Sequence, residues 1–298
     1  MSKIVPHFWF TTEVEEAVDF YISLFEDSKV ITVQKLEGTP SGDNAISIEF
    51  VLANQKFAAI NGGPYFKPNP SISFTVLCDS NEEIDHLWKE FADGGREIIP
   101  LQQQPFSAYY GWIEDRYGFS WQLIHSEAEA YDQKVIPSLM FSGNVTGQAD
   151  EAIDFYVRLF QNGKRLETSL YEENQASPSK AKVSHATFEL MGTALIASDN
   201  VGMTDFNFTF NEAVSLMVLC VTQAEIDYYW EKLSADPDAE ECGWLKDKYG
   251  VSWQIIPHRL TELLESGTRE QINTVTQAFL EMKKIDIGKL EDIWQREG

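Results

Sequence analysis

The chain contains the same sequence pattern twice. GWIEDRYGFSWQLI at residues 111–124 returns as GWLKDKYGVSWQII at residues 243–256, with nine of fourteen positions identical. Two more pairs follow in the same order: FYISLFEDSK at 20–29 with FYVRLFQNGK at 155–164, and ISFTVLCDSNEEID at 72–85 with VSLMVLCVTQAEID at 214–227. Three matching segments in one order indicate two copies of one domain.

The repeat predicts the division of the chain. We expect a first domain at residues 1–128, a second at 133–258 and a helical extension at 259–298, with SEAEAYDQ at 126–133 as the linker. A length of 298 residues suits about two domains of roughly 150 residues each. Each copy is therefore long enough to bury its own core.

Composition excludes several classes of function. Hydrophobic residues make up 43% of the chain, so it should fold, and a net charge of −24 repels phosphate backbones and anionic membranes. No apolar run reaches the roughly 18 residues of a membrane span, and the start lacks a signal-peptide pattern. Three cysteines without CxxC spacing predict neither a disulfide framework nor a thiolate metal site. We expect a cytoplasmic protein without nucleic-acid or membrane partners.

The hydrophobic period in each copy switches twice between two and about 3.6 residues. In copy one this predicts, in order, a strand at Pro6–Phe10, a helix at Glu13–Phe25 with Thr12 as N-cap, strands at Lys29–Leu36, Ala45–Leu52 and Lys56–Ile60, a strand at Ser71–Cys78, a helix at Asn81–Phe91 capped by Ser80, and strands at Tyr110–Glu114 and Ser120–His125. A Gln-rich loop is expected at Leu101–Ser107. Each copy is thus predicted to be a βαβββ unit used twice.

The two βαβββ units per copy are accompanied by the FYxxLF helix, the NGGP turn at 61–64 and the DxYGxSWQ hairpin. With these features the chain resembles the vicinal oxygen chelate superfamily, which includes glyoxalases, bleomycin-resistance proteins and dioxygenases. The chain is most similar to the PhnB-like branch, whose domain bears the name 3-demethylubiquinone 3-methyltransferase. The resemblance covers nearly the whole chain, including the tail sequence at 275–294.

This resemblance implies an α+β fold of tandem vicinal oxygen chelate domains. In each domain two βαβββ units would form a cupped mixed sheet with helices on its convex face, and a helical tail would follow. We expect the two copies to pair as an intrachain pseudo-dimer, each completing its own cup without exchange of strands. Further assembly into a homo-oligomer stays open.

Alternation along strands separates the predicted core from the predicted cup, because residues two apart share a face. The apolar face of copy one consists of Phe8, Phe10, Phe74, Val76, Cys78, Trp121 and Leu123. The opposite face consists of His7, Trp9, Ser73, Thr75 and Gln122, joined by Glu49. We expect the first set to pack under the helices and the second set to line the cup of copy one.

The resemblance implies metal ligands at or next to His7, Ser73 and Gln122. A neutral serine and a neutral glutamine supply no charge to offset the desolvation of a divalent ion, so we expect no cofactor. If a divalent metal does bind, the predicted ligands are His7, Glu49 and Gln122. The matching positions of copy two predict no metal site: Ser138, Met140, Thr187, Ser215, Met217 and Gln254.

Two residues are candidates for catalysis. His7 is the only imidazole expected in the first cup, and its ordinary pKa lies near working pH, so it could act as a general base. Glu49 is a candidate cup carboxylate. Each also fits a structural role, as a hydrogen-bonding strand residue for His7 and as an exposed strand residue for Glu49.

The predicted ligand-binding residues are Trp9, Ser73, Thr75, Gln122 and Asn61. Trp9 could stack on a planar ligand, and Asn61 begins the NGGP turn, which is either a tight turn or a rim for ligand approach. Asp115 and Asp247 precede Tyr-Gly in the last hairpin of each copy, where turn chemistry accounts for them.

The absence of known cofactor-binding motifs excludes some enzyme classes. A common S-adenosylmethionine methyltransferase needs a Gly-rich loop between a strand and a helix, and no GxGxxG occurs, so that activity is not expected. Three hypotheses remain: a metal-independent small-molecule-binding protein that uses the first cup, a divalent-metal lyase, isomerase or dioxygenase, and a scaffold whose tail mediates assembly. Whether the chain is an enzyme is open, and small-molecule binding is the preferred interpretation.

Overall fold

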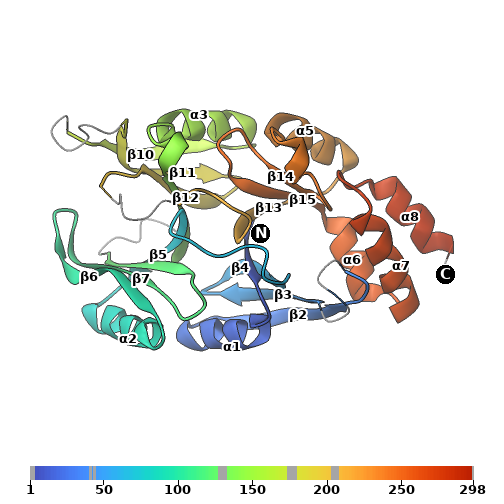
Figure 1. Cartoon of the computed structure of the whole chain (residues 1–298), viewed down its shortest axis with the longest axis horizontal. Helices are drawn as coiled ribbons and strands as arrows, with labels where there is room; N and C mark the ends of the chain where they lie inside the picture. Colours follow the sequence, from blue (N-terminus) through green and yellow to red (C-terminus); the bar gives the residue numbers. More distant parts are fainter. Residues whose placement is uncertain are drawn as a thin grey trace.

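The computed structural model describes residues 4–39, 42, 45–126, 133–172, 180–202 and 208–296, so most of the predicted linker lies outside the described residues. Over this part of the chain, two mixed β-sheets form the centre of the molecule (Figure 1). Helices α1 and α2 lie along one side and α3 and α5 along the other, while the last three helices lie together at one end.

Copy one consists of two βαβββ units, as predicted. The first contains β1 (Ile4–Phe10), α1 (Val14–Leu24), β2 (Lys29–Leu36), β3 (Ala45–Leu52) and β4 (Gln55–Asn61). The second contains β5 (Ile72–Cys78), α2 (Asn81–Ala92), β6 (Arg96–Gln104), β7 (Ser107–Glu114) and β8 (Ser120–His125). Ser80 caps α2 by accepting from the Glu83 backbone N–H, whereas the N-cap of α1 is Glu13, not Thr12. Most of the expected Gln-rich loop belongs to β6, because it pairs with β7.

Copy two repeats this order, but over the described residues it has two additional short 3-10 helices and one strand fewer. Its first unit contains β9 (Val135–Phe141), η1 (Gly143–Val145), α3 (Ala149–Leu159), β10 (Lys164–Leu170), β11 (Val183–Leu190) and β12 (Thr193–Asp199). Its second unit contains β13 (Val214–Cys220), α5 (Gln223–Leu233), η2 (Pro237–Ala239), β14 (Trp244–Lys246) and β15 (Ser252–Pro257). The short helix η2 stands where copy one has β6.

Each sheet combines one unit from each copy. The seven-stranded sheet has the order β14-β15-β13-β1-β4-β3-β2, and the eight-stranded sheet has the order β10-β11-β12-β9-β5-β8-β7-β6. The two central pairs, β1 with β13 and β5 with β9, are antiparallel and join different copies. The copies therefore form an intrachain pseudo-dimer, but the expectation that each cup is completed without exchange between them is wrong.

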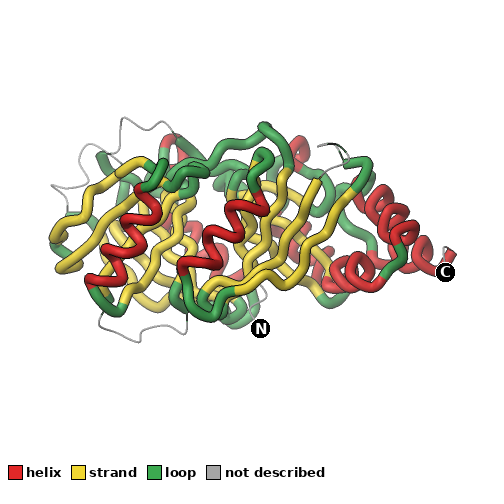
Figure 2. Tube along the Cα trace, turned by 90° about the horizontal axis from the view of Figure 1, so that it is seen from below, coloured by secondary structure: helices red, strands yellow, loops and turns green. Residues whose placement is uncertain are grey.

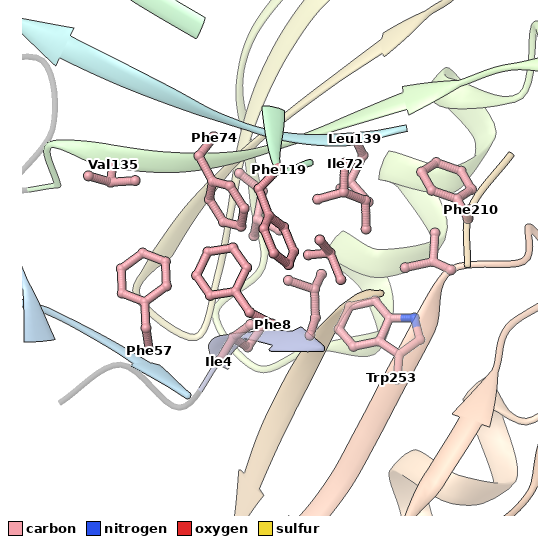
Figure 3. Packing of buried hydrophobic residues seen from close by; sticks show 14 of the residues in the cluster. Ile4, Phe8, Phe57, Ile72, Phe74, Phe119, Val135, Leu139, Phe210 and Trp253 are labelled. Atoms are coloured by element: carbon pink, nitrogen blue, oxygen red, sulfur yellow. The ribbon is translucent and has the colours of Figure 1, made fainter. Parts of the chain in front are cut away.

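The physical reason is the way the two units of one copy pack. Their convex faces meet through a shared aromatic core, in which the rings of Phe8 on β1 and Phe74 on β5 lie 4.8 Å apart between centroids (Figure 3). That face-to-face packing leaves one edge of β1 and one edge of β5 unpaired within copy one. Strands β13 and β9 of copy two supply the missing backbone partners.

The helices cover the convex faces, as the fold class predicts. α1 packs on β3, α2 on β7 and β8, α3 on β11, and α5 on β15. A single hydrophobic cluster extends through both sheets and both copies, and it includes Phe8, Phe74 and Trp121 of the predicted core set. The opposite, concave faces are called here the seven-stranded cup and the eight-stranded cup.

The tail contains α6 (His258–Ser266), α7 (Arg269–Leu280) and α8 (Ile287–Arg296). Its apolar side chains converge on a small core of their own, formed by Leu260, Leu263, Val275, Ile285 and Leu290. The apolar surface that a scaffold role would need is thus largely used within the chain. None of the described helices combines the length and the apolar character that crossing a membrane requires.

Candidate functional site

The structure separates the predicted site residues into two groups. His7, Trp9, Glu49 and Asn61 belong to strands β1, β3 and β4 of the seven-stranded sheet, whereas Ser73, Thr75 and Gln122 belong to β5 and β8 of the eight-stranded sheet. The predicted metal ligands His7, Glu49 and Gln122 therefore lie in different sheets. The faces were predicted by alternation, but alternation does not tell which units share a sheet.

The floor of the eight-stranded cup is a chain of hydrogen-bonded neutral side chains. Gln122 donates through Nε2 to Ser73 Oγ at 2.8 Å and accepts through Oε1 from the Tyr110 hydroxyl at 2.7 Å. Thr75 Oγ1 and Ser138 Oγ lie 2.7 Å apart, across the pair that β5 forms with β9. Three predicted ligand-binding residues thus meet here, joined by Tyr110 and, from copy two, Ser138.

Strand β11 of this cup carries an imidazole, that of His185, which the sequence analysis did not predict as a site residue. His185 Nε2 lies 3.2 Å from Thr187 Oγ1. Desolvation lowers the pKa of His185, and the nearby Glu167 carboxylate opposes that shift. Its position two residues before Thr187 on β11 was the available signal, because Thr187 had already been placed on the cup face.

The same floor also has an apolar part and one hydrogen-bond donor without a protein partner among the described residues. Ile136, Ala194, Ile196 and Leu77 form a separate cluster away from the main core. Trp112 pairs in register with Gln122, and its buried Nε1 has no hydrogen-bond partner among the described residues. The eight-stranded cup therefore offers apolar contact and hydrogen-bonding groups side by side.

His7 is buried in the seven-stranded cup, with 4% of its surface exposed. Its ring meets the Trp244 ring edge-on at 5.4 Å, and Nδ1 has no hydrogen-bond partner within the described residues. Burial lowers the pKa of His7 to about 3, so the imidazole is neutral at pH 7. The expectation of a pKa near working pH is wrong, because no neighbouring charge offsets the desolvation.

Glu49 lies on the same sheet but is engaged by a cation. The Lys56 ammonium on β4 contacts its carboxylate at 2.7 Å. His7 and Glu49 both pair in register with Ala58 of β4, so one strand lies between them. The structure does not bring the two candidate catalytic residues into contact.

The NGGP turn holds Trp9 and β3 in place. A Cβ on Gly62 would lie 2.1 Å from the Trp9 indole, so this position requires glycine, and Trp9 Nε1 donates to Gly63 O at 2.8 Å. Asn61 Oδ1 accepts from the Ile46 backbone N–H on β3. The tight-turn interpretation of this segment therefore accounts for the contacts of Asn61 and Gly62.

The described residues contain no group of three His, Cys, Asp or Glu side chains placed to hold a metal ion. The cross-strand neighbour of His7 on β13 is Ser215, whose Oγ accepts from Gln254 Nε2 on β15 at 2.9 Å. The Ser215 hydroxyl and the Gln254 amide are bonded to each other, and His7 adds a neutral imidazole. This set does not fit a divalent ion, since none of the three groups supplies a negative charge.

A surface cleft of about 610 Å³ lies at the carboxyl end of β1. Its lining includes Trp9, Phe66, Glu16, Arg96 and Arg116. Both guanidinium groups are already paired, Arg96 with Glu114 and Arg116 with Asp93. Both arginines of the cleft are therefore neutralised by acidic partners.

The repeated DxYGxSWQ motif forms a buried network rather than a turn alone. Asp115 is 3% exposed; its Oδ2 accepts from the Tyr21 hydroxyl at 2.6 Å and from Trp121 Nε1 at 2.8 Å. Its Oδ1 accepts from the backbone N–H groups of Tyr117 and Phe119. Copy two repeats all four bonds, with Asp247 as the acceptor for Tyr156, Trp253, Tyr249 and Val251. The simultaneous repetition of Tyr, Asp and Trp in both copies was the sequence signal for this network.

The Asp115 carboxyl should make stability depend on pH. Burial raises its pKa to about 6 from 3.8, so the folded state binds a proton more tightly than the unfolded state. This contribution to the free energy of unfolding is fully present below pH 3.8 and is lost as pH rises through about 6. Asp115→Asn removes the titration, so the stability of the wild type relative to the variant should fall by roughly 3 kcal/mol between these limits.

Urea unfolding of both proteins from pH 4 to pH 7 measures this difference. Asp247 is present in both proteins and cancels in the comparison. Stability curves that stay parallel over this range would show that Asp115 does not titrate as expected.

Comparison with known proteins places the chain in a family. A family model described as 3-demethylubiquinone-9 3-methyltransferase matches residues 2–124 and again residues 133–256. No curated protein matches. Among solved structures, a Bacillus cereus PhnB protein described as a putative 3-demethylubiquinone-9 3-methyltransferase is 34% identical over 42% of this chain and 99% of its own, with a TM-score of 0.40.

Two point mutants of glyoxalase I from Zea mays share the fold over most of the chain. The first is 12% identical, covers 88% of this chain and 96% of its own, and has a TM-score of 0.54. The second is 13% identical, covers 89% and 97%, and has the same TM-score of 0.54. The two family matches span most of both copies, and the chain therefore belongs to the PhnB-like family described as 3-demethylubiquinone-9 3-methyltransferase.

Proposed function

We propose that the eight-stranded cup binds a small, uncharged, amphipathic molecule through direct hydrogen bonds and without a metal. The observation that supports this most is the Tyr110–Gln122–Ser73 chain beside the Thr75–Ser138 pair, all on one concave face. Hydroxyl and amide groups that are held in place by each other form a preorganised floor for a hydrogen-bonding ligand.

The floor keeps hydrogen-bonding capacity for a ligand. The Gln122 amide has a second N–H and a second lone pair beyond the two bonds it makes, and it is only half-buried. Trp112 Nε1 adds a donor that lacks a protein partner over the described residues. The apolar body of the ligand would then contact the cluster around Ile136 and Ile196.

Charge disfavours an anionic ligand. The five floor residues named above contain no cation, and the chain as a whole has a net charge of −24. An anion would therefore enter the cup against the field and without a counter-charge on the floor. Methyl transfer does not fit this chain, because the sequence lacks a GxGxxG loop and the described strands form two mixed sheets instead of a parallel nucleotide-binding sheet.

Isothermal titration calorimetry with 1-naphthol, an uncharged aromatic alcohol, tests the proposal, with 1-naphthoate as the anionic counterpart. We expect saturable binding of 1-naphthol and at least tenfold weaker binding of 1-naphthoate. Gln122→Leu should weaken 1-naphthol binding about tenfold, because it removes one hydrogen bond and leaves Tyr110 and Ser73 unpaired.

The repeat supplies a matched control. Gln254→Leu removes the equivalent amide from the seven-stranded cup, where Gln254 donates to Ser215 as Gln122 donates to Ser73. It should leave 1-naphthol affinity unchanged. An equal loss in both variants, or no saturable binding by the wild type, would contradict the proposal.

A further inference from the structure

The C-terminal tail crosses the mouth of the seven-stranded cup. α6 starts directly after β15, near one edge of the sheet, and α7 reaches Glu37 at the end of β2, the other edge strand. Figures 1 and 2 show these helices at the end of the molecule that holds the seven-stranded sheet. The tail therefore connects a copy-two edge of this cup with a copy-one edge.

On the copy-two side the tail is firmly attached. The backbone N–H groups of Cys242 and Gly243 each donate to a tail carbonyl, of Met282 and Lys283, at 2.7 Å. Gln223 also binds the tail twice, donating through Nε2 to Ile285 O at 3.1 Å and accepting the Ile287 N–H at 2.9 Å. The Ile285 side chain is fully buried at this contact.

On the copy-one side the attachment is polar and exposed. Glu37 forms an ion pair with Arg269, whose side chain is 81% exposed, and accepts from Asn273 Nδ2 at 3.1 Å. Gln277 Nε2 donates to the backbone carbonyls of Glu37 and Gly38 at 3.0 and 3.2 Å. Exposed ion pairs contribute little to stability, so this contact, called here the Glu37 latch, is the weaker of the two attachments.

One side chain of α7 and one side chain of the cup floor each have a buried polar atom without a hydrogen-bond partner among the described residues. Thr276 is fully buried, and its Oγ1 has no hydrogen-bond partner among the described residues, as is true of His7 Nδ1. Thr276 lies three residues after Asn273, so both occupy the face of α7 that turns towards the latch. Val5, Ala58 and Leu219 on the concave face are buried as well.

We propose that α7 is a lid on the seven-stranded cup, closed by the Glu37 latch and hinged on the copy-two attachment. Opening the latch separates α7 from Glu37 and Gly38, while Val275 keeps it packed on the tail core and the anchored segment at 282–287 keeps the tail on the protein. The open state admits small uncharged molecules to the floor at His7. This inference concerns the other cup and does not rest on ligand binding in the eight-stranded cup.

Diethyl pyrocarbonate, a small uncharged reagent for neutral imidazole, measures access to His7. The reaction is followed by mass spectrometry of the His7 peptide, with the exposed His86 as the internal reference. In the double variant Glu37→Ala/Gln277→Ala, which removes the latch, we expect the modification rate of His7 to rise about tenfold relative to the wild type. The rate of His86 should not change.

Hydrogen exchange of the same proteins separates lid opening from unfolding of the tail. Exchange in α7 should rise in the double variant, while α8 stays protected. Lys164→Ala is the control, because it removes an exposed ion pair with Glu189 in the other sheet and should change neither readout. An unchanged His7 rate, or equal loss of protection in α7 and α8, would overturn the lid.

Discussion

Replacing Asp115 by alanine should lower the free energy of unfolding by about 3–5 kcal/mol at pH 7. The variant loses the one acceptor shared by the Tyr21 hydroxyl, Trp121 Nε1 and two backbone N–H groups. Three of these donors, the Tyr21 hydroxyl, Trp121 Nε1 and the Phe119 N–H, would then be buried without this acceptor, and an unpaired buried donor costs about 1–3 kcal/mol. The effect should be large because α1, β8 and the hairpin before β8 all meet at this carboxylate.

Denaturant unfolding monitored by circular dichroism measures this change. Asp93→Ala is the control, since the Asp93 side chain is 77% exposed in its pair with Arg116 and its loss should cost under about 0.5 kcal/mol. Asp247→Ala should behave like Asp115→Ala, because its four bonds are the same. A cost for Asp115→Ala no larger than that of Asp93→Ala would mean that the network does not support the fold.

Phe8→Ala should destabilise the protein by about 3–5 kcal/mol as well. Phe8 is fully buried, and its ring contacts Phe57 in its own sheet, Phe74 in the other sheet and Phe119 in the turn before β8 (Figure 3). The substitution removes a ring from the point where the two sheets pack, and the surrounding aromatic side chains cannot collapse into the space without moving β1.

The matched control is Phe106→Ala, which removes the same group from a side chain that is 66% exposed at the β6–β7 hairpin. Its effect on the free energy of unfolding should stay within about 0.5 kcal/mol. Thermal and urea unfolding of both variants give the comparison. A loss below about 1 kcal/mol for Phe8→Ala would contradict a shared core between the sheets.

Much of the local structure could be predicted from the residues alone. The repeat, the βαβββ order of copy one and the Ser80 cap follow from sequence patterns, and the structure contains all three. Alternation also separated Phe8 and Phe74 in the core from Ser73 and Gln122 on the concave face. Apart from the repeat, which requires both copies, these are properties of a few neighbouring residues.

The candidate site was harder to predict because it depends on contacts between distant segments. Alternation places His7 and Gln122 on the same predicted face of copy one. However, β1 pairs with β13 and β5 pairs with β9, so the two residues lie in different cups. The low pKa of His7 follows from burial, and burial depends on Trp244 of copy two. His185 was missed because its cup is completed only when β11 joins the sheet of β5.

Sequence periodicity and repetition thus specify most of the strands, the face that their side chains take and the presence of two copies. The tertiary structure alone establishes that units of different copies share a sheet, that the tail crosses only the seven-stranded cup, and that Asp115 and Asp247 are buried acceptors. The physical reason is that side-chain period is a local property of the backbone, whereas edge pairing and desolvation depend on which distant surfaces meet.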